Sequence, residues 1–144
     1  MKLKCLIADD EPLALDVLEN FIKRTPDLEL VGRCENAMQA IQTLKEKQVD
    51  LLFTDIEMPE FNGIELVKSL NTKPLIIFTT AHPEYAVQGY ELDIVDYLLK
   101  PIAFDRFVKS VNKASELMNF KKGESHVKDE LDYIFIKSEQ KYIK

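Results

Sequence analysis

Four short apolar runs in this chain each stop at a residue whose side chain can take part in chemistry. The runs and the residues that follow them are CLIA (5–8) before Asp9 and Asp10, LLFT (51–54) before Asp55, LIIFT (75–79) before Thr80 and DYLL (96–99) before Lys100. Apolar runs of this kind are typical of strands buried on both faces of a parallel sheet. Because the carboxyl ends of parallel strands meet at one edge, we expect these five residues to converge there.

Segments with helical spacing of apolar residues separate these runs. We predict strands at 3–8, 28–34, 51–54, 75–79 and 94–99, alternating with helices at 12–24, at 36–47, from Gly63, at 84–90 and at 103–118. This (βα)5 alternation predicts an α/β fold with right-handed crossovers. We expect a doubly wound, flavodoxin-like parallel sheet with strand order 2-1-3-4-5. On the second helix, Met38, Ile41 and Leu44 are expected to face the sheet.

Composition limits the partners and the compartment. Residues 1–120 hold 13 Lys and Arg against 20 Asp and Glu, and such an acidic surface argues against direct binding of DNA by this part of the chain. Cys5 and Cys34 lie in apolar runs and are predicted to be buried free thiols, which favours a reducing compartment. Because the N-terminus lacks the apolar stretch of a signal peptide and no segment approaches a membrane span, we expect a cytoplasmic domain.

The carboxylates predicted at the sheet edge would repel one another, and this repulsion would raise their pKa values unless a cation lay among them. Oxygen ligands of this kind suit Mg²⁺, which keeps several of its waters. Asp55 is then the best candidate for a nucleophile that accepts a phosphoryl group, with Lys100 as the cation and Thr80 as a hydroxyl donor. Each residue alone would be interpreted as a helix cap, a surface lysine or an ordinary strand residue. Their joint position at strand ends favours the phosphoryl site.

Four segments, in this order, resemble the receiver domain of two-component response regulators. They are IADDEP (7–12), DIEMPEFNG (55–63), FTTAH (78–82) and DYLLKP (96–101), and the resemblance extends from residue 3 to about 118. It implies that Asp55 accepts a phosphoryl group from a sensor histidine kinase. The domain would then be a signalling switch that assists phosphoryl transfer and its own dephosphorylation, and not an enzyme.

The resemblance also implies a ligand set for the metal. Mg²⁺ would be bound by Asp10, by Asp55 and by the backbone carbonyl of Glu57, with Asp9 acting through a metal-bound water. The sequence contains no Walker loop, no G-x-G-x-x-G motif and no zinc-ligand spacing, so no other cofactor is expected.

Further roles follow from the same resemblance. Thr80 and Lys100 would hold the phosphoryl oxygens, and Tyr97 matches an aromatic switch whose ring turns inward when Thr80 moves toward the phosphate. Glu57 and His82 match positions that tune how fast the acyl phosphate hydrolyses, and solvent-facing side chains without kinetic effect are an equally good interpretation.

The segments DYLLKP and FTTAHPEYA are most similar to receivers of LytTR-class transcription regulators, and residues 133–144 resemble the first strand and turn of a LytTR DNA-binding domain. We therefore expect a receiver domain (1–120), a linker (121–132) and the start of a truncated DNA-binding domain (133–144). DNA binding is implied for the parent protein through its missing C-terminal domain, not for this fragment.

The output surface implied by the resemblance comprises the fourth helix, the fifth strand and the fifth helix. Phosphorylation would favour a homodimer through this face, for which Tyr90, Ile94 and Val108 are candidate residues. Val108 is equally well explained as a core residue.

Two rival hypotheses start from the same residues. A magnesium phosphohydrolase of the haloacid dehalogenase type needs Asp-x-Asp after its first strand, whereas here Asp55 follows the third strand and is separated by one residue from Glu57. A pseudo-receiver used only for protein contacts would need neither the acid set nor Thr80 and Lys100, so their joint presence argues against it.

Overall fold

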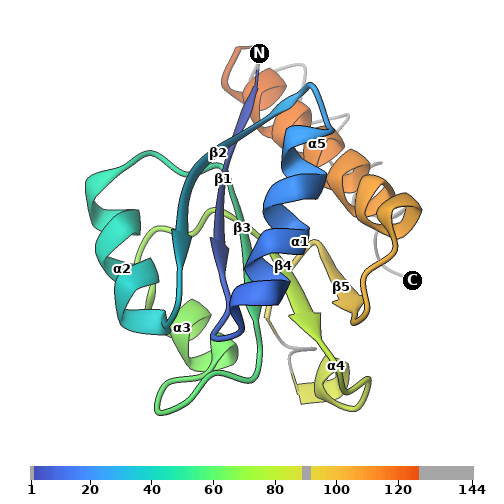
Figure 1. Cartoon of the computed structure of the whole chain (residues 1–144). Coiled ribbons are helices and arrows are strands. Elements are labelled where there is room, and N and C mark those ends of the chain that lie inside the picture. Colours follow the sequence, from blue (N-terminus) through green and yellow to red (C-terminus); the bar gives the residue numbers. More distant parts are fainter. Residues whose placement is uncertain (1, 89–91, 127–144) are drawn as a thin grey trace.

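The computed structural model describes residues 2–88 and 92–126, which form a five-stranded parallel sheet with helices on both faces (Figure 1). The strands are β1 (Leu3–Ala8), β2 (Leu28–Cys34), β3 (Leu51–Asp55), β4 (Leu75–Thr80) and β5 (Asp96–Leu99), and the helices are α1 (Pro12–Lys23), α2 (Ala37–Glu46), α3 (Gly63–Ser69), α4 (Tyr85–Gln88) and α5 (Phe104–His126). The strand order is β2-β1-β3-β4-β5. The predicted fold class and strand order are confirmed.

Two hydrophobic cores hold the helices against the sheet. Helices α1 and α5 cover one face, where the rings of Phe53 and Phe107 stack with centroids 5.3 Å apart. The other face, under α2 and α3, is built around Phe78 and Leu66. Strands β3 and β4 are buried along their whole length, which explains why the sequence shows them as unbroken apolar runs. This packing fixes the strand ends that carry the candidate site.

The interior of β1 and β2 holds the two cysteines, which are buried and free, as predicted. Burial raises the pKa of the Cys5 thiol to about 12, so this thiol stays protonated and unreactive at neutral pH. No helix in residues 2–88 and 92–126 is long and apolar enough to cross a membrane.

Helix α2 turns a different face to the sheet from the one expected. Ala37 and Ala40 are buried, Ile41 and Leu44 are packed against the same core, and Met38 is 66% exposed. The expectation for Met38 was wrong because the small alanines let the helix lie close to the sheet, and the position after Ala37 then points about 100° away.

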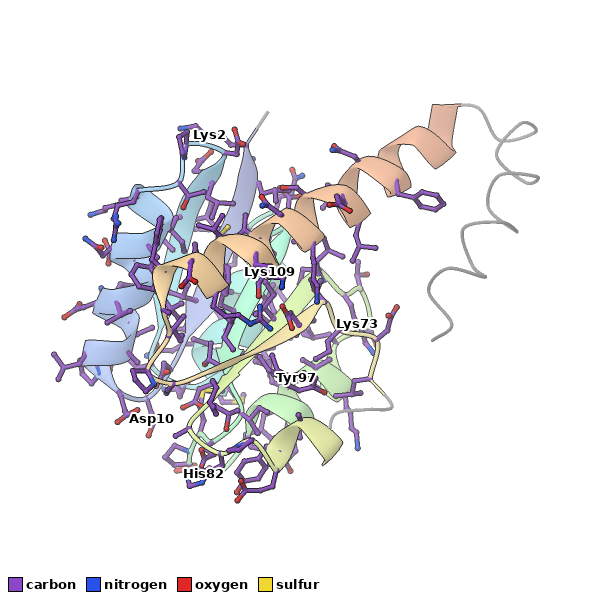
Figure 2. All side chains as sticks on the ribbon, turned by 90° about the vertical axis from the view of Figure 1, so that its right-hand side faces the viewer. Lys2, Asp10, Lys73, His82, Tyr97 and Lys109 are labelled. Atoms are coloured by element: carbon purple, nitrogen blue, oxygen red, sulfur yellow. The ribbon has the colours of Figure 1, made fainter. Side chains whose placement is uncertain are left out.

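The described part of α4 is Tyr85–Gln88, within the helix predicted at 84–90, and Tyr90 lies outside the described residues. The helix after β5 differs in length from the prediction. Helix α5 reaches His126, beyond the expected end near 118, and Figure 2 shows its last turns extending past the sheet. The expected linker at 121–132 therefore overlaps the end of α5, and the segment assigned to a DNA-binding domain lies outside the described residues.

A network of charged groups ties the edge strand β5 to α5. Arg106 donates to both carboxylate oxygens of Asp96, at 2.7 and 2.9 Å, and Ser110 donates to the same carboxylate at 2.6 Å. Arg106 also donates to the backbone carbonyl of Tyr97 at 3.2 Å. Burial raises the pKa of Asp96, but the hydrogen bonds from Arg106 and Ser110 outweigh it and lower the value to about 2.

We expect Asp96→Asn to destabilise the domain by about 2 kcal/mol at neutral pH. The folded pKa lies below the unfolded value of 3.8, so the carboxylate stabilises the fold above about pH 4 and loses that effect as pH falls toward 2. Urea unfolding at pH 7 and near pH 3 checks this, with Asp105→Asn, at an exposed acid of α5, as the control. If the free energies of unfolding of the parent and of Asp96→Asn differ by the same amount at both pH values, the charge of Asp96 does not stabilise the fold.

Candidate functional site

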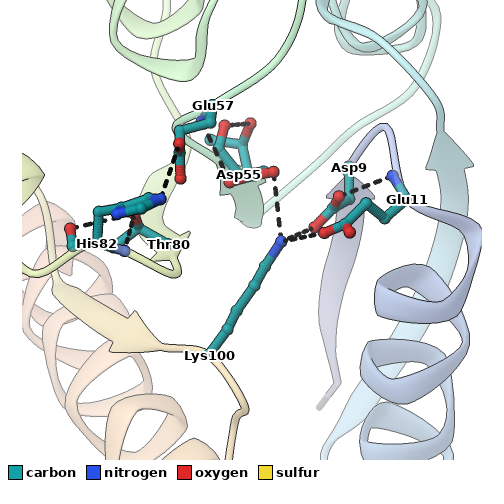
Figure 3. Close-up of polar contacts among 8 residues, drawn as sticks. Asp9, Glu11, Asp55, Glu57, Thr80, His82 and Lys100 are labelled. Carbon is teal, nitrogen blue, oxygen red and sulfur yellow. Dashed lines mark hydrogen bonds and ion pairs between the residues drawn. The ribbon is translucent and has the colours of Figure 1, made fainter.

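The carboxyl ends of four strands bring the predicted residues to one edge of the sheet. Asp9 directly follows β1, Asp55 and Thr80 are the last residues of β3 and β4, and Lys100 directly follows β5. The peptide bond between Lys100 and Pro101 is cis. Figure 3 shows the Lys100 side chain reaching from β5 toward the acids of β1 and β3.

Lys100 lies at the centre of this cluster. Its Nζ is 2.8 Å from Oδ2 of Asp9, 3.3 Å from Oδ2 of Asp55 and 3.2 Å from Oε1 of Glu11. The side chains of Asp9 and Asp55 are 0% and 4% exposed, whereas that of Glu11 is 66% exposed. The ammonium therefore contacts two buried carboxylates and an exposed third one, and its single charge balances only one of them.

The protonation of Asp55 depends on this arrangement. Burial and the negative charge of Asp9 raise the pKa of Asp55 to about 7, and Lys100 together with the backbone N–H of Glu57 limits the rise. Burial lowers the pKa of the Lys100 ammonium, but its bond to Asp9 and the charges of Asp55 and Asp9 raise the pKa overall. Lys100 thus remains charged, and a further cation near Asp55 would favour its ionised form.

Three carboxylates could hold that cation. One oxygen each of Asp9, Glu11 and Asp55 lies within 4.8 Å of the other two, and carboxylate oxygens are the ligands that hard divalent cations prefer. Glu11 was not among the candidates from the sequence. Its position directly after the Asp9-Asp10 pair, in the same loop, is the signal that could have identified it.

Asp10 and Glu57, the other expected metal ligands, lie beside this cluster and are not part of it. The exposed Asp10 lines an open hollow of about 380 Å³ together with Glu57 and Met58. The backbone N–H of Glu57 donates to Oδ1 of Asp55 at 3.2 Å. The structure thus brings Asp9 and Asp55 into contact with Lys100 and leaves Asp10 at the mouth of the site.

Thr80 is engaged with the loop that follows it. Its hydroxyl accepts from the backbone N–H of His82 at 3.0 Å and lies 3.3 Å from the backbone carbonyl of the same residue. The His82 ring lies 3.4 Å from the carboxylate of Glu57 and 3.8 Å from that of Glu84. Glu57 and His82 therefore join the β3–α3 and β4–α4 loops beside Asp55 (Figure 3).

Tyr97 lies under this edge of the sheet. Its ring is 5.8 Å from that of Phe78, within the core that α2 and α3 cover. Its hydroxyl is buried without a hydrogen-bond partner among the described residues, and burial raises its pKa. A buried hydroxyl without a partner costs free energy. The ring already lies inward in this structure, which is the position that the receiver resemblance expects it to take when Thr80 moves toward a phosphate.

The β3–α3 loop returns tightly against Asp55. Asn62 and Glu65 form a reciprocal capping box at the start of α3, and the N–H of Gly63 donates to the carbonyl of Ile56 at 2.8 Å. A β-carbon on Gly63 would lie 2.3 Å from the backbone oxygen of Asp55. Only glycine leaves room for this approach, which fixes the backbone of Asp55.

Comparisons with known proteins agree with this geometry. A family model described as the response regulator receiver domain matches residues 5–112. The chain belongs to the response regulator receiver family. The predicted family, which is a family of signalling switches, is thereby confirmed.

The relatives of this receiver domain include transcription regulators. It is 43% identical over 111 residues to the transcriptional regulatory protein BtsR of Escherichia coli, covering 76% of this chain and 46% of BtsR. It is 37% identical over 114 residues to the sensory transduction protein LytT of Bacillus cereus, covering 77% and 46% of the two chains. The chain thus spans about half the length of these curated relatives. The receiver (REC) domain of AraT, a response regulator from Geobacillus stearothermophilus, superposes with a TM-score of 0.77 at 30% identity, over 85% of this chain and 99% of that one.

Proposed function

We propose that this receiver accepts a phosphoryl group on Asp55 from a sensor histidine kinase, with Mg²⁺ bound, and thereby controls a DNA-binding transcription regulator. The observation that carries the proposal is the pair of buried carboxylates, Asp9 and Asp55, around the single ammonium of Lys100 at the carboxyl edge of a parallel sheet. The names of the relatives BtsR and LytT support a regulatory output.

In the proposed transfer, a carboxylate oxygen of Asp55 attacks the phosphorus of a phosphohistidine. The P–N bond breaks, its electron pair remains on the imidazole nitrogen, and a P–O bond to Asp55 forms. Asp55 must be ionised to attack. Lys100 stabilises that form in the resting site and then meets the negative charge of the phosphoryl oxygens.

The donor set fits a hard divalent cation, because carboxylate oxygens of three residues already lie within 4.8 Å of one another. We propose that Asp10, Asp55 and the Glu57 carbonyl bind Mg²⁺, with Asp9 acting through water and Glu11 as a further nearby acid. Bound Mg²⁺ would neutralise charge on the transferred group. The exposed Asp10 lines the hollow beside this cluster together with Glu57.

The switch is proposed to begin at Thr80. To reach a phosphoryl oxygen, its hydroxyl must leave the backbone of His82, which frees the start of the β4–α4 loop. Tyr97 then changes rotamer, and the surface of α4, β5 and α5 shifts toward a form that pairs with a second copy. Ile94 and Val108, the latter on α5 itself, are partly buried and pack against the two cores of the domain. Both side chains would therefore be displaced when that face moves.

The domain division and the compartment belong to the same proposal. The receiver covers residues 1–120, a linker follows at 121–132, and DNA is bound through a C-terminal LytTR-like domain that begins near residue 133. A cytoplasmic location fits the buried free thiols. The domain assists its own phosphorylation and dephosphorylation but turns over no separate substrate.

Intact-mass spectrometry after incubation with acetyl phosphate tests the acceptor. We expect a single phosphoryl adduct that requires Mg²⁺ and is absent in Asp55→Asn. An adduct that persists in Asp55→Asn would assign the acceptor to another residue. No adduct, under conditions that modify a known receiver, would favour the pseudo-receiver hypothesis instead.

The role of Glu57 and His82 is tested by the lifetime of that adduct. Their side chains lie 3.4 Å apart beside Asp55, where the charge of Glu57 can hinder or align an attacking water. We expect Glu57→Gln and His82→Gln to change the half-life of the acyl phosphate. An unchanged half-life in both variants would leave the pair without a kinetic role.

A further inference from the structure

Glu11 differs from the other two acids around Lys100 because its side chain lies at the surface. It is 66% exposed, whereas Asp9 and Asp55 are 0% and 4% exposed. Its Oε1 lies 3.2 Å from the Nζ of Lys100, a side chain that is itself only 16% exposed. Glu11 thus covers the solvent side of the ammonium (Figure 3).

The backbone of Glu11 is held in place independently of its carboxylate. Its N–H donates to Oδ1 of Asp9 at 2.9 Å, and its carbonyl accepts from Ala14 and Leu15 in the first turn of α1. Glu11 occupies the N-cap position of α1, yet its side chain makes no capping hydrogen bond. The carboxylate can therefore leave Lys100 without disturbing the loop or the helix.

A phosphoryl group on Asp55 needs the same ammonium. Lysine has three N–H donors, and Lys100 already faces three carboxylates at 2.8 to 3.3 Å. While the group approaches and Asp55 is still a carboxylate, a phosphoryl oxygen that binds Lys100 must therefore replace one of them. Separating Lys100 from a buried carboxylate leaves an uncompensated charge, whereas an exposed ion pair is weak. Glu11 is the carboxylate that gives way.

We propose that Glu11 is a releasable partner of Lys100 that occupies the ammonium in the resting site and slows loading of the phosphoryl group on Asp55. This inference rests on the proposed phosphoacceptor function. Glu11 is a positioning residue, because it acts on the reaction through Lys100. Its removal leaves one donor of Lys100 free for the incoming group.

The contact itself can be tested without phosphorylation. In metal-free protein, acetylation by acetic anhydride followed by peptide mass spectrometry measures how accessible Lys100 is, with the exposed Lys109 as the internal reference. We expect Glu11→Gln and Glu11→Asp to raise acetylation of Lys100 about three- to fivefold, as the loss of an exposed ion pair allows. Unchanged acetylation in both variants would overturn the contact.

The kinetic consequence is tested with acetyl phosphate at saturating Mg²⁺. We expect Glu11→Gln to speed formation of the Asp55 adduct about two- to fivefold. Glu11→Asp keeps the negative charge but shortens the side chain by one methylene, which moves the carboxylate away from Lys100. We therefore expect this variant to form the adduct about as fast as Glu11→Gln. Asp16→Asn, which removes an exposed charge one turn further along α1, should match the parent. In a Lys100→Met background, Glu11→Gln should have no effect.

These variants separate the possible outcomes. Acceleration in Glu11→Gln with parental behaviour in Glu11→Asp would overturn the proposal in favour of a simple effect of charge. An unchanged or slower rate in Glu11→Gln would overturn it too. If the parent protein forms no adduct, the phosphoacceptor function fails, while the acetylation experiment still decides whether Glu11 covers Lys100.

Discussion

Replacement of Gly63 by alanine is expected to destabilise the domain by about 3 kcal/mol, at the upper end of the usual cost of overpacking. The new β-carbon would lie 2.3 Å from the backbone oxygen of Asp55 and 3.0 Å from the Cα of Ile56. These are backbone atoms at the end of a buried strand, so no side-chain rotation relieves the clash. The free energy of unfolding from urea titration measures the effect.

Gly32→Ala provides the matched control. There the added β-carbon would meet the end of the Leu6 side chain at 3.0 Å and that of Thr43 at 3.5 Å, and such side chains can move by a few tenths of an ångström. We expect a loss below about 1 kcal/mol, since alanine also restricts the unfolded chain. Equal stability of Gly63→Ala and Gly32→Ala would contradict the tight approach of the β3–α3 loop.

Gly63→Ala should also reduce phosphorylation in the fraction that folds. The backbone of Asp55 is the atom group that must shift, and a displacement of the acceptor carboxylate by a fraction of an ångström misaligns it with Lys100. The yield of adduct with acetyl phosphate, corrected for the folded fraction, measures this. Unchanged yield would mean that the loop relaxes away from Asp55.

Much of the site was predictable because parallel topology converts a sequence pattern into a spatial one. Asp9, Asp55, Thr80 and Lys100 are far apart in the sequence, but each ends an apolar run, and parallel strands of one sheet must present those ends together. The order of the strands came from analogy with flavodoxin-like α/β folds, not from the apolar pattern.

The predictions that were wrong or missing concern residues whose position depends on packing against other elements and not on the local sequence pattern. Met38 and Ala37 are adjacent, and only the close approach of α2 to the sheet determines that the smaller residue faces inward. Glu11 was missed because an acid at a helix start is common, although its place directly after the Asp9-Asp10 pair was a signal that could have identified it. Its contact with Lys100 spans 89 positions along the chain, which the sequence does not reveal. The extension of α5 to His126 was missed because the apolar stripe ends near residue 118. The polar residues that follow contain no glycine or proline before Gly123, so they can continue the helix.

Lys100→Met is expected to lower the free energy of unfolding of the metal-free protein by about 3 kcal/mol at pH 8. It removes the cation from between Asp9 and Asp55, which are 0% and 4% exposed. Added Mg²⁺ should restore much of this loss, because a divalent cation at the same carboxylates replaces the missing charge. Urea unfolding in the presence of EDTA or Mg²⁺ measures both effects, with Lys109→Met as the control at an exposed lysine of α5.

The dependence of this loss on pH identifies its cause. Asp55 has a pKa of about 7 in the fold against 3.8 as a free side chain, so between these values the folded state binds more protons than the unfolded state and stability falls as pH rises. Without Lys100 the pKa of Asp55 rises further. Near pH 5 Asp55 is then protonated in the folded state, and burying its neutral carboxyl group costs little free energy. The penalty of Lys100→Met should therefore be small near pH 5 and grow toward pH 8. A loss that is equal at both pH values, or that Mg²⁺ leaves unchanged, would mean that Lys100 supports the fold through packing of its side chain and not as the counter-ion of the acceptor.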